Sequence, residues 1–273
     1  IPISFTIPVE VDIPDTQPIP IPVITSKYIM LNCINWQSMA SIPVSEASEH
    51  TYFVIEVLPT GVLLVKNPTQ EVKFVADVHA GGKKATFSVA GGAQDSGHIK
   101  TAVTVNRTAF INEITSHLTQ FGYDGVTLDI ENTSIDPQVM ADFVNALRVK
   151  FETIKTGLII GMYTQPYQLP TVFSKIEQAA PALTWISPMV YDFEFTMDEL
   201  KNYTRAWEAK VGKNKLLCGI AVNYSPGGLD APKYGQVLDM VTQEGWKGVG
   251  VWQNTIYLDA WKNMRKAKWP QIY

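Results

Sequence analysis

Apolar residues gather into eight short runs along the chain, and most of these runs are followed by a stretch with helical spacing. The strand-like runs cover residues 28–34, 52–58, 85–90, 123–131, 157–163, 184–191, 215–223 and 247–252. Helical patterns cover residues 107–121, 172–180, 196–211 and 231–244, and two more begin near residues 136 and 257. The runs are almost continuously apolar, which is typical of parallel strands buried on both faces. This repeated alternation predicts an α/β protein built as a single-domain (β/α)8 (TIM) barrel.

An open, doubly wound sheet is the alternative architecture for the same alternation. That fold usually carries a glycine-rich phosphate loop directly after its first strand. Here the first run continues into Asn32-Cys-Ile-Asn-Trp36, and neither GxGxxG nor GxxxxGKS/T occurs in the chain. The barrel is therefore favoured, and it predicts chemistry at the C-terminal ends of the strands.

Composition and charge remove several classes of protein. The chain has 273 residues, of which 46% are hydrophobic and 18% charged, which is too apolar for a disordered chain. Its formal net charge is −4 and it has no basic block, which argues against nucleic acid or an anionic membrane as a partner. No apolar run reaches the roughly 18 residues of a membrane span, so we expect no membrane association.

Residues 1–25 differ from the rest of the chain because they are crowded with proline. The prolines are Pro2, Pro8, Pro14, Pro18, Pro20 and Pro22. Repeated proline prevents a helix or a central strand and leaves an extended or polyproline II backbone. Two interpretations remain open, a semi-rigid linker or a segment whose isoleucines and valines lie against the domain. We therefore divide the chain into this segment and a barrel of residues 26–273.

Metal and thiol chemistry find little support in the sequence. Cys33 and Cys218 fit neither a disulfide framework nor a zinc spacing, so we expect two buried thiols inside strands. The histidines are scattered, without a metal-binding spacing, and they are His50, His79, His98 and His117. No GxSxG elbow indicates a serine hydrolase. We expect neither a metal nor a cofactor.

The start of the sequence and its glycosylation sequons favour a secreted protein. The sequence begins at Ile1 rather than at methionine, and no secretory leader pattern is visible, so we interpret this start as processed or trimmed, after a signal peptide or an upstream module. Acceptor sequons for N-glycosylation occur at Asn106, Asn132, Asn202 and Asn223. We expect a secreted, monomeric protein.

The fourth strand-like run carries the most informative pattern of the chain. In Asp124-Gly-Val-Thr-Leu-Asp-Ile-Glu131, alternate residues point to opposite faces of a strand. One face is apolar and should pack against the helices, and it consists of Val126, Leu128 and Ile130. The other face should point into the barrel, and it consists of Thr127, Asp129 and Glu131. Closely spaced carboxylates raise one another's pKa, which favours a protonated general acid near neutral pH.

This run resembles the DGxDxDxE signature of the family 18 glycoside hydrolases, the chitinases and endo-β-N-acetylglucosaminidases. Three further segments occur in the family's order. Ser88-Val-Ala-Gly-Gly92 is similar to the SxGG turn, with Ala90 where a glycine is usual, and Met189-Val-Tyr-Asp192 matches MxYD. Trp252 ends the eighth run, where the family places a tryptophan under the sugar. The resemblance spans roughly residues 26–265.

The resemblance implies a retaining mechanism in which the substrate supplies the nucleophile. Glu131 would protonate the glycosidic oxygen, and the acetamido oxygen of the sugar would attack the anomeric carbon to form an oxazolinium ion. Asp129 would bind the acetamido N–H and Tyr191 the acetamido carbonyl. The remaining candidate substrate-binding residues are Asp192, Met189 and Trp252. The implied substrate is chitin or another N-acetylglucosamine-containing glycan.

Thr127 departs from the family pattern, which usually carries an inward-facing aspartate at this position. Threonine can donate a hydrogen bond to Asp129 but cannot take up a charge. We therefore expect a slower enzyme with a shifted pH optimum rather than an inactive one.

The seventh run and the next helix are separated by only a few residues, near Tyr224 and Ala231. This spacing leaves no room for the α+β domain that many chain-end-binding chitinases insert here. The resemblance therefore implies an open groove suited to internal cleavage. Aromatic residues that follow strand ends are candidates for lining it, and they are Tyr163, Tyr167, Phe193, Phe195 and Tyr257.

Two alternative functions remain open. A catalytically silent relative would keep sugar recognition without turnover, although such relatives commonly lose the acid, and Glu131 persists here. An endo-β-N-acetylglucosaminidase would use the same acetamido chemistry on the chitobiose core of N-glycans. The catalytic strand alone does not distinguish between the two substrates.

Overall fold

Eight parallel strands form a barrel in the computed structural model, which describes residues 26–35, 42–90, 96–131, 134–191, 196–221, 231–252 and 259–273. The barrel strands are β1 (Tyr28–Ile34), β2 (Glu49–Val57), β4 (Lys84–Ala90), β5 (Gly125–Asp129), β6 (Ile159–Thr164), β7 (Trp185–Pro188), β8 (Leu217–Ala221) and β9 (Gly248–Trp252). A short strand, β3 (Leu63–Leu64), pairs antiparallel with the end of β2. The predicted (β/α)8 architecture is confirmed.

The barrel closes between the two strands at the ends of the sheet. The hydrogen-bonded order is β7-β6-β5-β4-β2-β1-β9-β8. A parallel bridge between Ile186 and Leu216 then joins β7 to the start of β8. Because all eight strands run the same way, their C-terminal ends meet at one mouth of the barrel.

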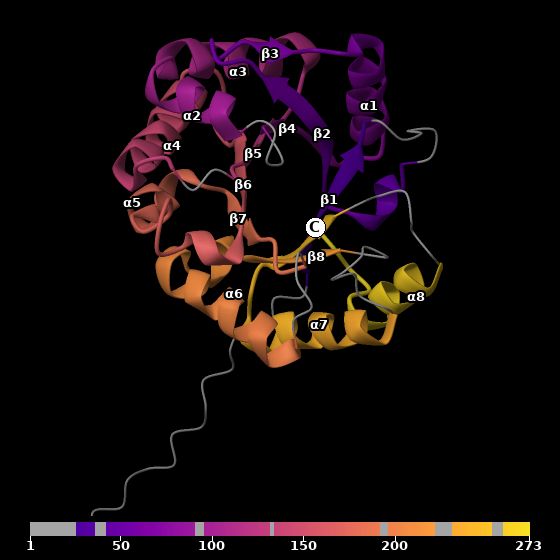
Figure 1. The fold of residues 1–273 in the computed structure, drawn as a ribbon. Helices are drawn as coiled ribbons and strands as arrows, with labels where there is room; N and C mark the ends of the chain where they lie inside the picture. The colour runs from indigo at the N-terminus through magenta and orange to yellow at the C-terminus, as the bar shows by residue number, and fades with distance from the viewer. Residues whose placement is uncertain are drawn as a thin grey trace, which may run out of the picture.

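Helices surround the strands on the outside of the barrel (Figure 1). They are α1 (Pro68–Ala80), α2 (Ser96–Thr104), α3 (Arg107–Phe121), α4 (Pro137–Glu152), α5 (Ile176–Ala179), α6 (Met197–Val211), α7 (Ala231–Glu244) and α8 (Asp259–Lys268). Short 3-10 turns occur at Val44–Glu46, Pro166–Gln168, Ala180–Ala182 and Lys213–Lys215. None of the described helices is long and apolar enough to cross a membrane.

Side chains at the helix N-termini explain why several helices begin where they do. The Asp136 side chain accepts hydrogen bonds from two backbone N–H groups of the first turn of α4, and Pro137 occupies its first position. Thr196 and Glu199 form a reciprocal capping box at the start of α6. These caps satisfy backbone N–H groups that have no partner within the helix.

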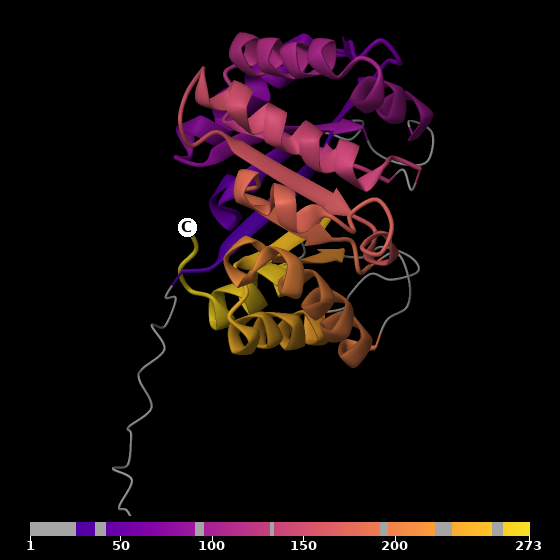
Figure 2. The ribbon, with the colours of Figure 1, turned by 90° about the vertical axis from the view of Figure 1, so that its left-hand side faces the viewer.

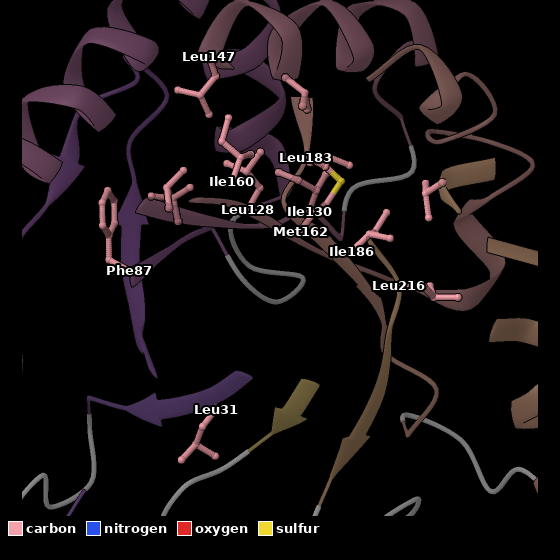
Figure 3. Close-up of a cluster of buried hydrophobic side chains, with 14 of the residues drawn as sticks. Leu31, Phe87, Leu128, Ile130, Leu147, Ile160, Met162, Leu183, Ile186 and Leu216 are labelled. Atoms are coloured by element: carbon pink, nitrogen blue, oxygen red, sulfur yellow. The ribbon is translucent and has the colours of Figure 1, made fainter. Parts of the chain in front are cut away.

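The outward-facing residues of the strands form the main hydrophobic core against the helices. Val126, Leu128 and Ile130 are all fully buried, and they belong to one cluster with Leu147 of α4. Figure 3 shows Leu128, Ile130 and Leu147 on the helix side of the sheet. The predicted alternation along this strand is therefore present in the structure.

A smaller cluster fills the inside of the barrel. Its buried members are Met30, Ile159, Tyr163, Trp185, Met189, Tyr191, Leu217 and Ala221. Glycine makes room for the largest of them, because a Cβ atom at Gly161 would lie 2.1 Å from the Trp185 ring. The interior is thus packed, as in other barrels of this kind, and does not form a pore.

The two ends of the described chain meet at the base of the barrel, opposite the mouth (Figure 2). Lys27 forms a parallel bridge with Ile272, and the Tyr273 backbone N–H donates to the Lys27 carbonyl at 3.2 Å. The C-terminal residues therefore pack against the entry to β1. The proline-rich residues 1–25 lie outside the described residues.

Three details of the predicted elements differ from the structure. The pattern did not predict α1 or α2, and β2 begins three residues before the predicted run, at Glu49. In the predicted helical stretch 172–180, residues 172–175 form turns, and the helix itself is the single turn α5, followed by a 3-10 turn. Pro181 follows this stretch and has no backbone N–H, so it cannot donate to the carbonyl of Glu177 and the α-helix does not continue through it.

Candidate active site

Strand β5 carries an acidic pair to the mouth of the barrel. Thr127 is fully buried, Asp129 is 2% exposed, and Glu131, just beyond the strand, is partly exposed. Asp129 lies between Ala90 of β4 and Tyr163 of β6 in the sheet register. The strand therefore presents three polar side chains in a row, and the last of them reaches solvent.

Gln165 is a site residue that the sequence pattern did not predict. It directly follows β6, and its Nε2 atom donates to Glu131 Oε2 at 3.3 Å. The Gln165 backbone N–H donates to Gln168 Oε1 at 2.7 Å, which fixes the turn after the strand. Its position at a strand end was the only available signal. Gln165 thus holds one oxygen of the candidate acid from the neighbouring strand.

Tyr163 lies inside the barrel and does not line a groove, contrary to the sequence prediction. It is 2% exposed, its hydroxyl accepts from Asn32 Nδ2 at 2.6 Å, and it donates to Met30 Sδ at 2.7 Å. Burial, reinforced by the negative charge of Glu49, raises the pKa of Tyr163 well above its usual value. This phenol therefore stays neutral. The prediction was wrong because the inward face of β6 turns Tyr163 toward β1.

Strand β7 brings Met189 and Tyr191 to the same interior cluster. Both side chains are 5% exposed, and they share the inward face that their spacing predicts. The Met189 backbone N–H donates to the Thr164 carbonyl at 2.8 Å, which ties the end of β7 to the end of β6. Asp192, the last residue of the MxYD segment, lies outside the described residues.

Trp252 ends β9 at the mouth and is partly exposed. Its ring meets the Phe53 ring edge to face, with centroids 4.6 Å apart and an interplanar angle of 86°. The space beside Gly250, two residues before Trp252 on the same strand, is filled by the protein itself. A Cβ at Gly250 would lie 2.5 Å from Ser187 Oγ, so neighbouring protein atoms already occupy that space.

Other predicted features are only partly described. Ser88 of the SxGG-like segment is fully buried, while its two glycines lie outside the described residues. Tyr167 is 50% exposed beside the end of β6. Phe193, Phe195, Tyr224 and Tyr257 also lie outside the described residues. Within the described ranges, no group of three or more His, Cys, Asp or Glu side chains is placed to hold a metal ion.

Comparison with known proteins gives a family match over most of the chain. The model of the glycosyl hydrolases family 18 matches residues 35–225, which is more than half of the sequence. Among curated protein sequences, none matches this chain.

Solved structures share the fold at low sequence identity. A mutant class V chitinase from Nicotiana tobaccum in complex with NAG4 aligns with a TM-score of 0.78 and 16% identity, over 91% of this chain and 100% of that one. A chitinase from Rhizomucor miehei gives a TM-score of 0.76 and 16% identity, over 89% and 100%. The spore cortex-lytic enzyme of Bacillus cereus gives 0.75 and 10%, over 91% and 75%.

Proposed function

Because the chain belongs to family 18 of the glycosyl hydrolases, we propose that it cleaves β-1,4-linked N-acetylglucosamine polymers, namely chitin and chito-oligosaccharides. The observation that supports this proposal most is the arrangement on β5. Asp129 is buried at the strand end, and Glu131 follows it as the partly exposed carboxyl at the barrel mouth. A general acid must reach the leaving oxygen of the substrate, and a carboxyl that is partly exposed at the mouth has that access.

The reaction proceeds in two steps that need no enzyme nucleophile. Glu131 gives its proton to the glycosidic oxygen while the 2-acetamido oxygen of the sugar attacks the anomeric carbon. Asp129 accepts a hydrogen bond from the acetamido N–H and stabilises the positive charge of the oxazolinium ion. Tyr191 donates its hydroxyl to the acetamido oxygen and so positions it. Water then opens the ring, and the Glu131 carboxylate takes its proton.

We assign substrate binding to the remaining candidate residues of the family pattern, together with the partner of the acid. Met189, Asp192 and Trp252 bind the sugar at the cleavage site, and Gln165 steadies the carboxyl of Glu131. The complex of the related tobacco chitinase with NAG4 supports an oligomer of N-acetylglucosamine as the ligand. The absence of an inserted domain after β8 in the sequence supports cleavage within a chain. We propose a secreted, monomeric enzyme.

Thr127 sets this protein apart from the usual family pattern, and we propose a reduced rate and a shifted pH optimum as the consequence. Thr127 is fully buried, and its hydroxyl lies 3.5 Å from the Thr51 hydroxyl. A neutral hydroxyl beneath Asp129 cannot share a charge with it. Replacing Thr127 with aspartate should therefore change the rate or the pH profile, and an unchanged profile would remove this part of the proposal.

Turnover of defined substrates separates the proposed function from its two alternatives. The proposal predicts hydrolysis of chitotetraose and of chromogenic chitobiose glycosides by the full chain. Binding of chitotetraose without turnover would support the silent sugar-binding protein. Release of a high-mannose glycan from a glycoprotein, with chito-oligosaccharides left intact, would support the N-glycan activity.

A further inference from the structure

A buried carboxyl lies at the base of the barrel, far below the mouth, and the proposed reaction does not use it. Glu49, the first residue of β2, is 0% exposed. Its Oε2 atom accepts from Trp185 Nε1 at 2.9 Å and from the Tyr28 hydroxyl. Its Oε1 atom lies 2.8 Å from the Thr86 hydroxyl. Burying a carboxyl is costly, and here the cost is offset by hydrogen bonds to both oxygens.

A series of threonine hydroxyls leads from Glu49 toward the mouth. The Thr86 hydroxyl lies 2.9 Å from the Thr51 hydroxyl, and Thr51 lies 3.5 Å from Thr127. All three threonines are 0% exposed. Thr127 precedes Asp129 by two residues on the same face of β5, so the series ends directly beneath the candidate catalytic aspartate.

Such a series of hydroxyls has two possible directions. Each hydroxyl has one proton to donate, so when Thr86 donates to an ionised Glu49, Thr51 donates to Thr86 and Thr127 donates to Thr51. The Thr127 hydroxyl oxygen then has only a lone pair to present toward the barrel mouth. When Glu49 is protonated and donates to Thr86, every hydroxyl reverses, and the Thr127 proton becomes free to point toward Asp129. The charge of Glu49 therefore determines whether Thr127 presents a proton or a lone pair toward Asp129.

We propose that Glu49 is a positioning residue for Asp129, and that the two carboxyls share one proton through the hydroxyls of Thr86, Thr51 and Thr127. In one state Glu49 is protonated and Asp129 is ionised, and in the other the charges are exchanged. One proton leaves Glu49 and one arrives at Asp129, so the number of protons is unchanged. This inference rests on the proposed function for its catalytic meaning, because it gives Asp129 a proton partner that Thr127 cannot be.

The groups that face Glu49 are compatible with a carboxyl that changes its charge. Burial raises the pKa of Glu49, whereas the hydrogen bonds and the Lys247 charge act against that increase. Lys247 lies 4.7 Å from the Tyr28 ring centre, and burial lowers the pKa of this lysine. Lys84, beside Glu49 in the register, pairs with Asp124 at 3.0 Å instead.

The neighbouring phenols remain neutral, so they take no part in this exchange of charge. Burial, with the Glu49 charge, raises the pKa of Tyr28 and Tyr163 well above the usual value. Tyr28 therefore acts as a fixed donor to Glu49. The proton that moves belongs to the two carboxyls alone.

The titration of Asp129 tests the proposal without requiring turnover. The probe is the side-chain carboxyl carbon of Asp129 in full-length protein labelled with carbon-13 aspartate, assigned with Asp129→Asn and followed by NMR against pH. In Glu49→Gln, the amide N–H donates to Thr86 and fixes the hydroxyls so that they point toward Asp129. The Asp129 midpoint should then fall by about one pH unit, since a donor favours the ionised form.

Breaking the series separates this coupling from a structural role of Glu49. In Thr51→Val, which removes the middle hydroxyl, the midpoint should fall by about half a unit, and adding Glu49→Gln should change it little further. Thr51→Ser restores a hydroxyl and should titrate like the wild type. If Glu49→Gln does not fold, the comparison of Thr51→Val with Thr51→Ser carries the test. Equal shifts with and without the Thr51 hydroxyl, or no shift in any variant, would overturn the proposal.

Activity assays keep the two proposals distinguishable. A wild-type protein that hydrolyses no glycoside but shows the coupled titration would refute the proposed function and leave the carboxyl pair established. If the wild type is active but the titration midpoint of Asp129 is the same in Glu49→Gln, only the proposed proton sharing between Glu49 and Asp129 is refuted. In an active enzyme, Glu49→Gln should shift the acidic limb of the pH–rate profile to lower pH by a similar amount.

Discussion

The two faces of a barrel strand have different roles, although successive residues of one strand point alternately to each face. The outward face of β5 carries Val126 and Leu128, which are both fully buried against the helices. The inward face of the same strand carries Thr127 and Asp129, which are equally buried but polar. The outward face stabilises the fold by removing apolar surface from water, and the inward face positions hydrogen-bonding groups. Fold and chemistry can therefore be changed separately.

The difference also appears in how each face accommodates bulk. The outer core is continuous with the helices, whereas the interior combines large rings with glycines, such as Trp185 beside Gly161. A deletion on the outside leaves a cavity, and an addition on the inside produces a clash. Substitutions on the two faces should therefore destabilise the protein by opposite mechanisms, a cavity on the outside and a steric clash on the inside.

The largest expected effect belongs to the inward face and concerns rate alone. Glu131→Gln removes the transferable proton, so kcat/KM should fall by about 10³-fold to 10⁴-fold. The unfolding temperature should stay within about 1 °C of the wild type, because the partly exposed side chain keeps its shape. Chitotetraose turnover and thermal unfolding measure the two quantities. The matched control is Glu152→Gln on the outer surface of α4, and a loss of rate there would contradict the separation.

The next effect belongs to the core between the strands and the helices, where α3 and α4 pack together, and it concerns stability alone. Phe143 is fully buried and stacks on Phe110, with ring centroids 5.5 Å apart and an angle of 6°. Phe143→Ala should lower the free energy of unfolding by about 3–5 kcal/mol. Urea unfolding measures this, with Phe143→Leu as the milder control. Below the transition, the folded variant should turn over substrate at the wild-type rate, and a slower folded enzyme would contradict the account.

Adding one carbon inside the barrel should be more harmful than adding one outside. A Cβ at Gly161 would lie 2.1 Å from the Trp185 ring, so Gly161→Ala should cost up to about 3 kcal/mol. A Cβ at Gly97 in α2 would meet nothing within 4 Å. Gly97→Ala should therefore be neutral or stabilising by less than about 1 kcal/mol. Equal unfolding temperatures for the two variants would show that the interior is loosely packed.

Asp124, at the opposite end of β5 from the acid, should act on stability in a pH-dependent way. Burial would raise its pKa, but the Ala85 N–H, His79 and Lys84 outweigh burial and hold the pKa below its usual value. The folded state therefore binds the proton less readily than the unfolded state. Stability from Asp124 is present above the unfolded pKa of about 4 and is lost as pH falls through the lower folded value.

Removing the Asp124 charge tests that assignment. Asp124→Asn should cost about 1.5 kcal/mol at neutral pH and should flatten the decline of stability below about pH 4. Urea unfolding at several pH values between about 2.5 and 7 gives the free energy of unfolding at each pH, and both effects should be changes on the order of 1 kcal/mol in it. Asp142→Asn, an exposed aspartate of α4, is the matched control. A variant that keeps the full acid dependence would assign that dependence to other carboxyls.

The smallest effect concerns the residue that holds the acid. Gln165 Nε2 donates to Glu131 Oε2 at 3.3 Å, a long contact that helps to orient the carboxyl. Gln165→Leu should lower kcat for chitotetraose hydrolysis about threefold, because the carboxyl loses the contact that orients it. The exposed Gln178→Leu serves as the control. An unchanged kcat would show that Gln165 does not position Glu131.

The fold was largely predictable because strand alternation repeats a simple geometric rule. A period of two was enough to divide Val126 and Leu128 from Thr127 and Asp129, since the backbone alone sets that period. Helix α1 was not predicted, because its residues do not follow the usual rule of buried apolar and exposed polar side chains. Its pattern is inverted in places, with Glu71 fully buried beside His117 at 2.8 Å and Val72 57% exposed.

The candidate site was predictable only where its residues lie close together in the sequence. Asp129 and Glu131 share one strand, so their spacing was visible. Gln165 and Glu49 could not be predicted, because their contacts join strands that meet only after the barrel closes. Tyr163 was misplaced for the same reason, since its partner Asn32 lies on β1. Spacing predicts a residue's side of the strand, and tertiary packing decides what it touches.

The anomeric form of the first product tests the central claim most directly. If the substrate's own acetamido group attacks and Glu131 supplies the proton, hydrolysis retains configuration. Proton NMR of a chitotetraose digest, recorded within the first minutes before mutarotation, should show the β-anomer at the new reducing end. Early appearance of the α-anomer would mean direct attack by water, and it would contradict the mechanism assigned to this barrel.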